Sequence, residues 1–199
     1  MALKVQYNKT FLTYLKRQLA IRKKVLPTLK SKETALRLEV KKISEKLKEL
    51  RKEKDLFNSE IKEISPLWTR YPQVLKIDSI DISIKNTAGT KIPVLNDIQF
   101  KLTEFIDFDQ PVWLLKGIDI LKNIISLETK EQILQQQHDV LYLARKKTTQ
   151  KVNLYEKVQI PAFERGINQI KRFLEDKDNI AKAAQKIVKE RNQRKEVAQ

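Results

Sequence analysis

The feature that most constrains the fold is a long apolar repeat between Leu12 and Ile64. Sixteen positions alternate in steps of three and four residues along this stretch, and thirteen of them are apolar. The three polar exceptions are Arg22, Glu33 and Lys54. A spacing of this kind, held over so many turns, predicts the seam of a coiled coil. At ~1.5 Å per residue the helix extends roughly 80 Å, so the seam needs a partner helix of similar length.

The same repeat returns near the end of the chain, at Phe163, Ile167, Ile170, Leu174, Lys177, Ala181, Ala184 and Val188. The partner helix is therefore predicted within the same chain. We expect a mainly α fold, a long antiparallel two-helix coiled coil in which residues 1–65 form the first helix and residues 111–199 the second. Antiparallel pairing then brings both termini to the same end of the coiled coil.

Between the two helices, residues 66–110 form an insert at the end opposite the termini. Within it the hydrophobic period changes from 3.5 to 2 over residues 77–102, around the turn-forming stretch Asn86–Thr90. Alternation on both sides of a short turn predicts a β-hairpin. A lone hairpin is marginal in water, so we expect one apolar face to be covered. The residues predicted on that face are Ile80, Ile82, Ile84, Ile98, Phe100 and Leu102.

The charge of the chain is strongly basic and unevenly distributed. The formal net charge is +16, and no acidic residue occurs before Glu33. Antiparallel pairing predicts a basic tip, where the two ends of the chain meet and contact an acidic partner; the alternative is a solvated face that keeps the seam soluble. The basic residues predicted at this tip are Lys16, Arg17, Arg22, Lys23, Lys24, Lys186, Lys189, Arg191, Arg194 and Lys195.

The sequence contains no pattern that indicates an enzyme site. There is no cysteine, the single histidine His138 has no accompanying metal ligand, and the three glycines are isolated rather than grouped in a phosphate-binding loop. We therefore expect no catalytic residues, no cofactor and no metal. No signal peptide or membrane-spanning run is recognised, which favours a cytoplasmic protein.

Several motifs resemble one family. Residues 15–19, 29–32 and 35–36 are similar to the first-helix pattern of the D subunit of V/A-type rotary ATPases. Residues 152–161, which read VNLYEKVQIP, resemble that family's Val-Asn-x-Leu-Glu-x-x-x-Ile-Pro segment. Glu164, Ile167 and Ile170 follow at the family spacing, and the order of helix, β-hairpin and helix agrees as well.

This resemblance implies a non-catalytic central-stalk subunit. Such a protein transmits torque between an ATP-hydrolysing or ATP-synthesising head and a membrane rotor that transports hydrogen ions or other cations. The implied partners are the A and B subunits of the head, the small F subunit of the stalk and a socket subunit on the rotor. The implied location is cytoplasmic and peripheral to the membrane through the complex, without membrane insertion, direct nucleotide binding or nucleic acid. Two alternatives are a free-standing coiled-coil scaffold and a basic helical hairpin that binds nucleic acid.

Overall fold

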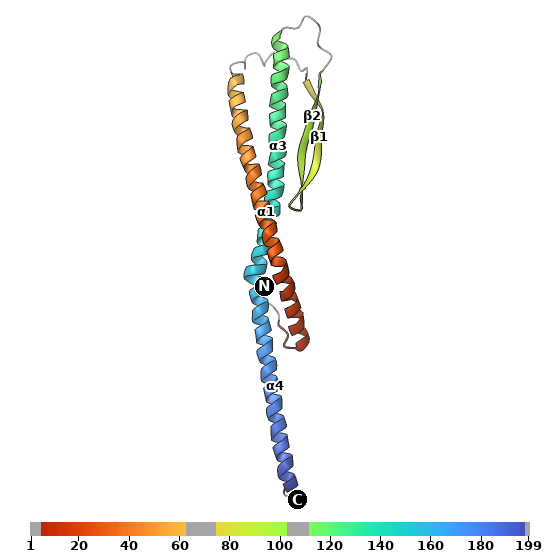
Figure 1. Ribbon diagram of the computed structural model, residues 1–199, viewed down its shortest axis with the longest axis vertical. Coiled ribbons are helices and arrows are strands. Elements are labelled where there is room, and N and C mark those ends of the chain that lie inside the picture. Colours follow the sequence, from red (N-terminus) through yellow and green to blue (C-terminus); the bar gives the residue numbers. More distant parts are fainter. Residues whose placement is uncertain (1–4, 63–74, 103–111, 198–199) are drawn as a thin grey trace. The chain divides into compact units, whose positions relative to one another are not determined.

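The computed structural model describes residues 5–62, 75–102 and 112–197. Its elements, in chain order, are the helix α1 (Lys9–Lys62), the strands β1 (Leu75–Thr87) and β2 (Thr90–Leu102), the helix α3 (Val112–Asn153), the π-helix η1 (Leu154–Gln159) and the helix α4 (Ile160–Val197). The prediction of a mainly helical chain with a small β-hairpin is confirmed (Figure 1). The chain divides into two compact units, unit 1 with residues 1–31 and 149–199, and unit 2 with residues 32–148.

In unit 2, α1 pairs with α3 in antiparallel orientation. The seam residues Leu36, Val40, Ile43 and Leu47 are all buried, and they form one cluster with Leu141 of α3. All four belong to the predicted apolar repeat, so their 3-4 spacing brings them to one side of the helix, where they pack against a partner. The long seam is thus paired within the same chain, as its length required.

The hairpin of unit 2 is a two-stranded antiparallel sheet that lies alongside α3 (Figure 1). Thr87 pairs with Thr90, and the two residues between them, Ala88 and Gly89, have positive φ of 50° and 72°. Positive φ at both central residues is the geometry of a two-residue hairpin turn that matches the twist of the strands. Ile92, which follows the turn, is 5% exposed and packs into the cluster around Leu36.

The sequence prediction assigned the wrong face of the hairpin to the core. Ile80, Ile82, Ile84 and Leu102 are exposed in this chain, Ile84 by 73%, whereas Ile98 and Phe100 are partly buried. Ile84 pairs with Pro93, and Lys85 with the buried Ile92. Directly paired residues point to the same face of an antiparallel sheet, so the side with Lys85 and Ile92 faces the helices. The isoleucines of β1 point to the opposite side.

In unit 1, α1 packs against α4 in antiparallel orientation. Leu15 is fully buried among Phe163, Ile167 and Ile170 of α4, which are three positions of the second predicted seam. The first turn of α1 is capped by Asn8, whose Oδ1 accepts a hydrogen bond of 2.6 Å from the backbone N–H of Phe11. A short polar side chain at this position satisfies a backbone donor that the helix leaves free.

The helix α4 extends well beyond the part that α1 covers. The ring of Tyr7, just before α1, lies 4.9 Å from the ring of Phe173, centroid to centroid. From residue 175 to residue 194 every position of α4 is exposed. The second seam is therefore paired only as far as Leu174, and the expectation that both ends of the chain meet at one tip is wrong. The reason is register, since Tyr7, just before α1, already lies beside Phe173.

Some sequence expectations fall on residues outside the described ranges. These are the boundaries of the insert at residues 66 and 110. The division of the chain into residues 1–65, 66–110 and 111–199 therefore stays a prediction.

Candidate functional site

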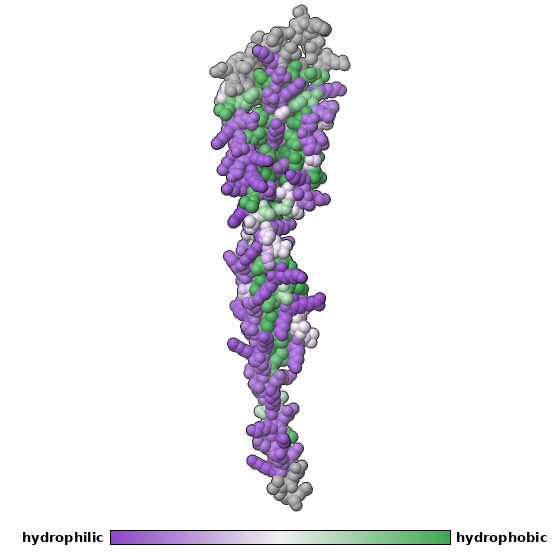
Figure 2. Space-filling view, in the orientation of Figure 1, coloured by the Kyte–Doolittle hydropathy of each residue, from purple (hydrophilic) through white to green (hydrophobic). Residues whose placement is uncertain are grey.

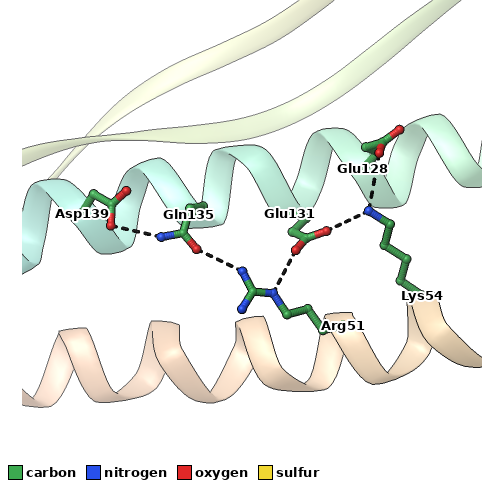
Figure 3. Close-up of polar contacts among 6 residues, drawn as sticks. All are labelled: Arg51, Lys54, Glu128, Glu131, Gln135 and Asp139. Atoms are coloured by element: carbon green, nitrogen blue, oxygen red, sulfur yellow. Dashed lines mark hydrogen bonds and ion pairs between the residues drawn. The ribbon is translucent and has the colours of Figure 1, made fainter.

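The helices of unit 2 are joined by a polar clasp at one end of their pairing (Figure 3). Arg51 and Lys54 of α1 both reach Glu131 of α3, with Arg51 Nε 2.8 Å from Oε1 and Lys54 Nζ 2.9 Å from Oε2. Lys54 Nζ also lies 3.5 Å from Glu128 Oε1. Each carboxylate oxygen of Glu131 thus binds a different cationic side chain of α1. These two contacts fix the axial position of α1 along α3.

The clasp shifts the titration of its two central groups in opposite directions. The hydrogen bond from Lys54, and then that from Arg51, lower the pKa of Glu131. The hydrogen bond to Glu131 raises the pKa of Lys54. In both residues the charged form is favoured because an opposite charge lies within hydrogen-bond distance.

A second polar contact joins the helices of unit 1 at Arg22. Arg22 Nε donates a hydrogen bond of 2.6 Å to Gln159 Oε1, and Nη1 donates one of 2.6 Å to Gln18 Oε1. The guanidinium carbon lies 4.6 Å from the ring centroid of Phe163 and 5.7 Å from that of Tyr155. A planar guanidinium can donate in its plane and stack on aromatic rings above and below it, which a lysine cannot do.

The acceptor Gln159 ends the π-helix η1, which the sequence analysis did not anticipate. Residue 160, which follows η1, donates its backbone N–H to the carbonyl of Tyr155, five residues earlier. Pro161 comes next, and a proline inside a helix lacks a hydrogen-bond donor and crowds the preceding turn. A π-turn widens the helix at such a point. Pro161 is the sequence signal that could have located it.

The third polar seam residue, Glu33, also contacts the opposite helix. Its Oε1 lies 3.9 Å from Arg145 Nε of α3 and 3.9 Å from Arg37 Nε on its own helix. The three polar seam positions therefore all carry side chains that contact the partner helix. The contacts are Arg22 with Gln159, Glu33 with Arg145 and Lys54 with Glu131.

The basic residues of the two chain ends are not brought together. Lys23 Nζ lies 2.7 Å from Glu164 Oε1, and Lys30 Nζ lies 2.7 Å from Glu156 Oε1. At ~1.5 Å per helical residue, Lys186 lies roughly 30 Å along α4 from Glu164. The predicted tip is thus two separate groups. Lys16, Arg17, Arg22, Lys23 and Lys24 lie beside the paired part of α4, and Lys186, Lys189, Arg191 and Arg194 lie on its uncovered part. The side chain of Lys195 falls outside the described part of the chain.

The uncovered part of α4 has apolar residues on a mostly hydrophilic surface. Ile180, Ile187 and Val188 are 70%, 56% and 57% exposed. Figure 2 shows that the visible surface of this part of the helix is largely hydrophilic, with only small apolar areas. Ile180, Ala184 and Ile187 recur at helical spacing, so they share one side of the helix. This stripe shares Ala184 with the second predicted seam, and no helix in the described part of the chain covers it.

Two further properties of the described residues concern metal binding and membrane spanning. Among the described residues, no three His, Cys, Asp or Glu side chains lie close enough together to hold a metal ion. His138 Nδ1 lies 3.2 Å from Asp139 Oδ1, and the imidazole stacks on the ring of Tyr142 at 6.0 Å. Within the described ranges, each helix lacks a stretch apolar enough to cross a lipid bilayer.

The sequence of this chain is similar to those of a known protein family. Residues 11–190 match a family described as the D subunit of ATP synthase. A V-type ATP synthase D subunit from Borreliella burgdorferi is 33% identical over 190 residues, which is 94% of this chain and 94% of the relative. The proteins of that name from Chlamydia caviae and Chlamydia muridarum are 24% and 27% identical, covering 87% and 76% of this chain and 88% and 78% of their own lengths.

Proposed function

Because the chain belongs to the family of ATP synthase D subunits, we propose that it is the central-stalk subunit of a V-type rotary ATPase. In this role it has no catalytic site of its own, and it transmits torque between the ATP-converting head and the ion-translocating membrane rotor. The observation that carries the proposal is the contact between helices at each of the three polar positions of the first repeat, namely Arg22, Glu33 and Lys54.

The mechanical argument concerns sliding between paired helices. When a pair of helices is twisted, each helix must slide along the other. Contacts that fix the axial position of one helix along the other therefore resist the twist. In unit 2 that position is fixed by the seam residues and by the clasp at Glu131. In unit 1 it is fixed by the Arg22 contacts and by the ion pair of Lys23 with Glu164. Torque applied to one helix is then shared by the other.

The uncovered part of α4 is the surface we assign to the A and B subunits of the head. Its basic side chains attract a ring of acidic or carbonyl-rich surface, and long charged side chains attract without fixing one rotational angle. The residues assigned to this contact are Lys186, Lys189, Arg191, Arg194 and Lys195. Five further basic residues, beside the paired part of α4, stay candidates for the same contact with the head. They are Lys16, Arg17, Arg22, Lys23 and Lys24.

The exposed isoleucine face of β1 is assigned to the stalk partners, which are the small F subunit and the socket subunit of the rotor. Exposed isoleucines lose unfavourable contact with water when a partner covers them. Through these partners the chain would be held at the membrane surface without entering it. Substituting Ile82→Ser and Ile84→Ser together is expected to weaken assembly with these partners while leaving the free chain folded.

A rotation experiment tests the torque role. The head is fixed to a glass surface, and a bead is attached to α4 or to the hairpin of this chain. ATP-driven stepwise rotation of the bead is the expected result. A bead that stays still while the same complex hydrolyses ATP would remove the torque role and leave a static subunit.

A charge experiment tests the contact with the head. Arg191, Arg194 and Lys195 are replaced by Gln, and assembly with the empty head is titrated at several salt concentrations. The matched control replaces Lys52, Lys101 and Lys147, which removes the same charge from exposed positions elsewhere. Weaker and less salt-sensitive assembly for the first variant alone supports the contact. Equal assembly for both variants leaves these residues only a role in solubility.

The other two functions considered for the sequence are less well supported. Nucleic-acid binding was based on a single basic tip, and the structure separates the two basic groups along α4. A free-standing scaffold would be expected to act outside a larger complex, whereas the relatives are named as subunits of a V-type ATP synthase.

A further inference from the structure

A groove of about 450 Å³ lies between the hairpin and the helices of unit 2. Its floor is apolar and is formed by all three neighbouring elements. Ile43 of α1, Ile92 of β2 and Ile133 of α3 are each no more than 6% exposed. Leu50, Leu134, Val94 and Leu95 complete the apolar part of the lining.

Three lysines surround this floor, each from a different element. Lys46 comes from α1, Lys85 from β1 and Lys130 from α3. Within the described ranges none of the three has an ion pair or a side-chain hydrogen bond. The only carboxylate of the lining is Glu39, and its Oε1 already lies 3.1 Å from Lys42 Nζ.

The remaining polar groups of the groove do not offset this charge. Gln137 is 8% exposed, and its amide Nε2 donates a hydrogen bond of 2.5 Å to the backbone carbonyl of Pro93. Thr87 and Asn96 also line the groove and are neutral. The three like charges repel one another, and Leu50, Val94, Leu95 and Leu134 are only partly buried, so they keep apolar surface in contact with water. Both costs fall when carboxylates and apolar side chains arrive together.

We propose that this groove binds an acidic amphipathic peptide segment of a partner protein. Its apolar side chains lie on the partly buried Leu50, Val94, Leu95 and Leu134 above the isoleucine floor, and its carboxylates pair with Lys46, Lys85 and Lys130. This is the binding mode in which the apolar side of a segment lies in a hydrophobic groove and its charged side sets specificity. The inference goes beyond the torque role and does not depend on it.

The spacing of the lysines favours a peptide over a single-chain lipid. A fatty acid carries one carboxylate and can neutralise one lysine, whereas the three lysines project from three separate elements around the floor. A peptide segment presents several carboxylates at intervals of three or four residues and can reach all of them. The site lies on the helix-facing side of the hairpin, opposite the exposed isoleucines.

The first test measures affinity with a defined probe. The probe is a fluorescent 15-residue helical peptide of Leu, Ala and Glu with one apolar side, and a second peptide carries Gln in place of Glu. We expect the Glu peptide to bind the full chain, with affinity at least tenfold lower for the triple variant Lys46→Gln, Lys85→Gln, Lys130→Gln. The control triple Lys52→Gln, Lys101→Gln, Lys147→Gln has the same net charge and should stay within about twofold of the wild type.

Each other outcome of this titration contradicts the proposal. Equal losses in the two triple variants would mean attraction to the overall positive charge only. Equal binding of the Glu and Gln peptides would remove the role of the lysines. Binding of laurate at the groove without binding of the peptide would assign the groove to a lipid. All six substitutions are at exposed positions, and circular dichroism confirms that the variants keep their helix content.

The second test locates the bound probe. The isoleucine δ-methyl groups are labelled with ¹³C, and their NMR signals are followed as the Glu peptide is added. Ile43, Ile92 and Ile133 should shift, while Ile167 and Ile170, buried in unit 1, should not. Shifts confined to other isoleucines would place the peptide elsewhere and overturn the proposal.

The third test uses the intact complex. A photo-reactive amino acid replaces Asn96 at the groove, and the cross-linked peptide is identified by mass spectrometry after purification of the whole ATPase. A cross-linked segment with apolar residues at helical spacing and an excess of Asp and Glu supports the proposal. A segment with an excess of Lys and Arg, or no cross-link above that of the same group at exposed Lys52, contradicts it.

Discussion

Lys54 of α1 donates a hydrogen bond to Glu131 of α3, with Nζ 2.9 Å from Oε2, although Lys54 occupies a seam position where a coiled coil usually has an apolar residue. The two side chains are 26% and 21% exposed, so the pair is shielded from water more than a surface ion pair. Shielding strengthens the attraction and also makes either charge costly if it is left alone.

The first prediction concerns the pH dependence of this pair. Glu131 has a pKa that is lowered in the folded chain from an ordinary value of 4.5. The contribution of Glu131 to the free energy of unfolding is therefore complete above pH 4.5. It is lost as the pH falls through the lower pKa of the folded chain. Glu131→Gln should reduce the free energy of unfolding by about 1 kcal/mol at pH 7, and the difference from the wild type should shrink in acid.

Urea denaturation at several pH values measures this effect. Glu49→Gln is the control, because Glu49 is exposed on α1 and has no ion pair among the described residues. The pH dependence is reversed for Lys54, because its pKa is raised in the folded chain. Its contribution to the free energy of unfolding is complete below pH 10.5 and is lost as the pH rises through the pKa of the folded chain. A difference between wild type and Glu131→Gln that did not depend on pH would rule out the linkage.

The second prediction concerns Arg22. Arg22→Lys keeps the charge but loses the planar donors to Gln159 and Gln18 and the stacking on Phe163. We expect the free energy of unfolding to fall by about 1–2 kcal/mol. Arg17→Lys is the matched control, since Arg17 is exposed. If both variants unfold at the same urea concentration as the wild type, the Arg22 contacts do not stabilise unit 1.

The third prediction separates the seam of α1 from its outer surface. Leu36 is fully buried in the cluster with Ile92 and Leu141, whereas Leu38 is 55% exposed. Leu36→Ala should lower the free energy of unfolding by about 2–5 kcal/mol, because it removes buried atoms and leaves a cavity. Leu38→Ala should change it by less than about 0.5 kcal/mol. Similar losses for the two variants would contradict the assigned orientation of α1.

The fourth prediction compares two glycines. Gly89 lies in the hairpin turn at φ +72°, where a side chain is strained, and an added Cβ would lie 3.1 Å from the flexible end of Lys32. Gly89→Ala should therefore destabilise the chain by about 1 kcal/mol. Gly166 is helical, and its added Cβ would meet Leu15 at 3.4 Å, an ordinary contact.

Gly166→Ala should accordingly stabilise the chain by up to about 1 kcal/mol, because alanine is the better helix former. Thermal unfolding followed by circular dichroism gives both values in the same buffer. The prediction rests on opposite signs for the two substitutions. A loss at Gly166 would show that Leu15 cannot adjust to the extra methyl group.

The helical part of this fold could be predicted from sequence because a heptad repeat carries its own geometry. Leu36, Val40, Ile43 and Leu47 were predicted seam residues, and all four are buried. The hairpin turn was also predictable, since Asn86–Thr90 contains Gly89, a residue type that adopts positive φ without strain, although Ala88 at φ 50° is not such a type.

The face of the hairpin could not be predicted in the same way. Alternation places Ile80, Ile82 and Ile84 on one side of β1, but it does not say which side meets the helices. The docked side is set by Ile92 on the other strand and by register shifts between Ile77 and Ser79 and between Asp81 and Ile82. Both depend on pairing between distant residues. The sequence also did not predict the groove, which exists only once the hairpin is docked.

The sequence predicts that the candidate interface residues are basic, but it does not predict where they lie in the structure. Composition indicates many lysines and arginines near both ends of the chain, and the register of the helix pair decides where they lie. Leu15 packs beside residues 163–170 of α4, and in the same register Tyr7 lies close to Phe173. A comparison of the two segment lengths would have indicated an unpaired extension, because residues 112–197 outnumber those of α1.

The uncovered part of α4 has a thermodynamic consequence. A helix without a packed neighbour is held only by the intrinsic preferences of its residues, and a stretch of this length is marginal in water. In the free chain, residues 175–194 should exchange with the random coil, and they become ordered when the apolar stripe at Ile180 and Ile187 is covered. The loss of chain entropy would then be subtracted from the free energy of binding, so a partner that covers this segment would bind it less tightly than the contact area suggests.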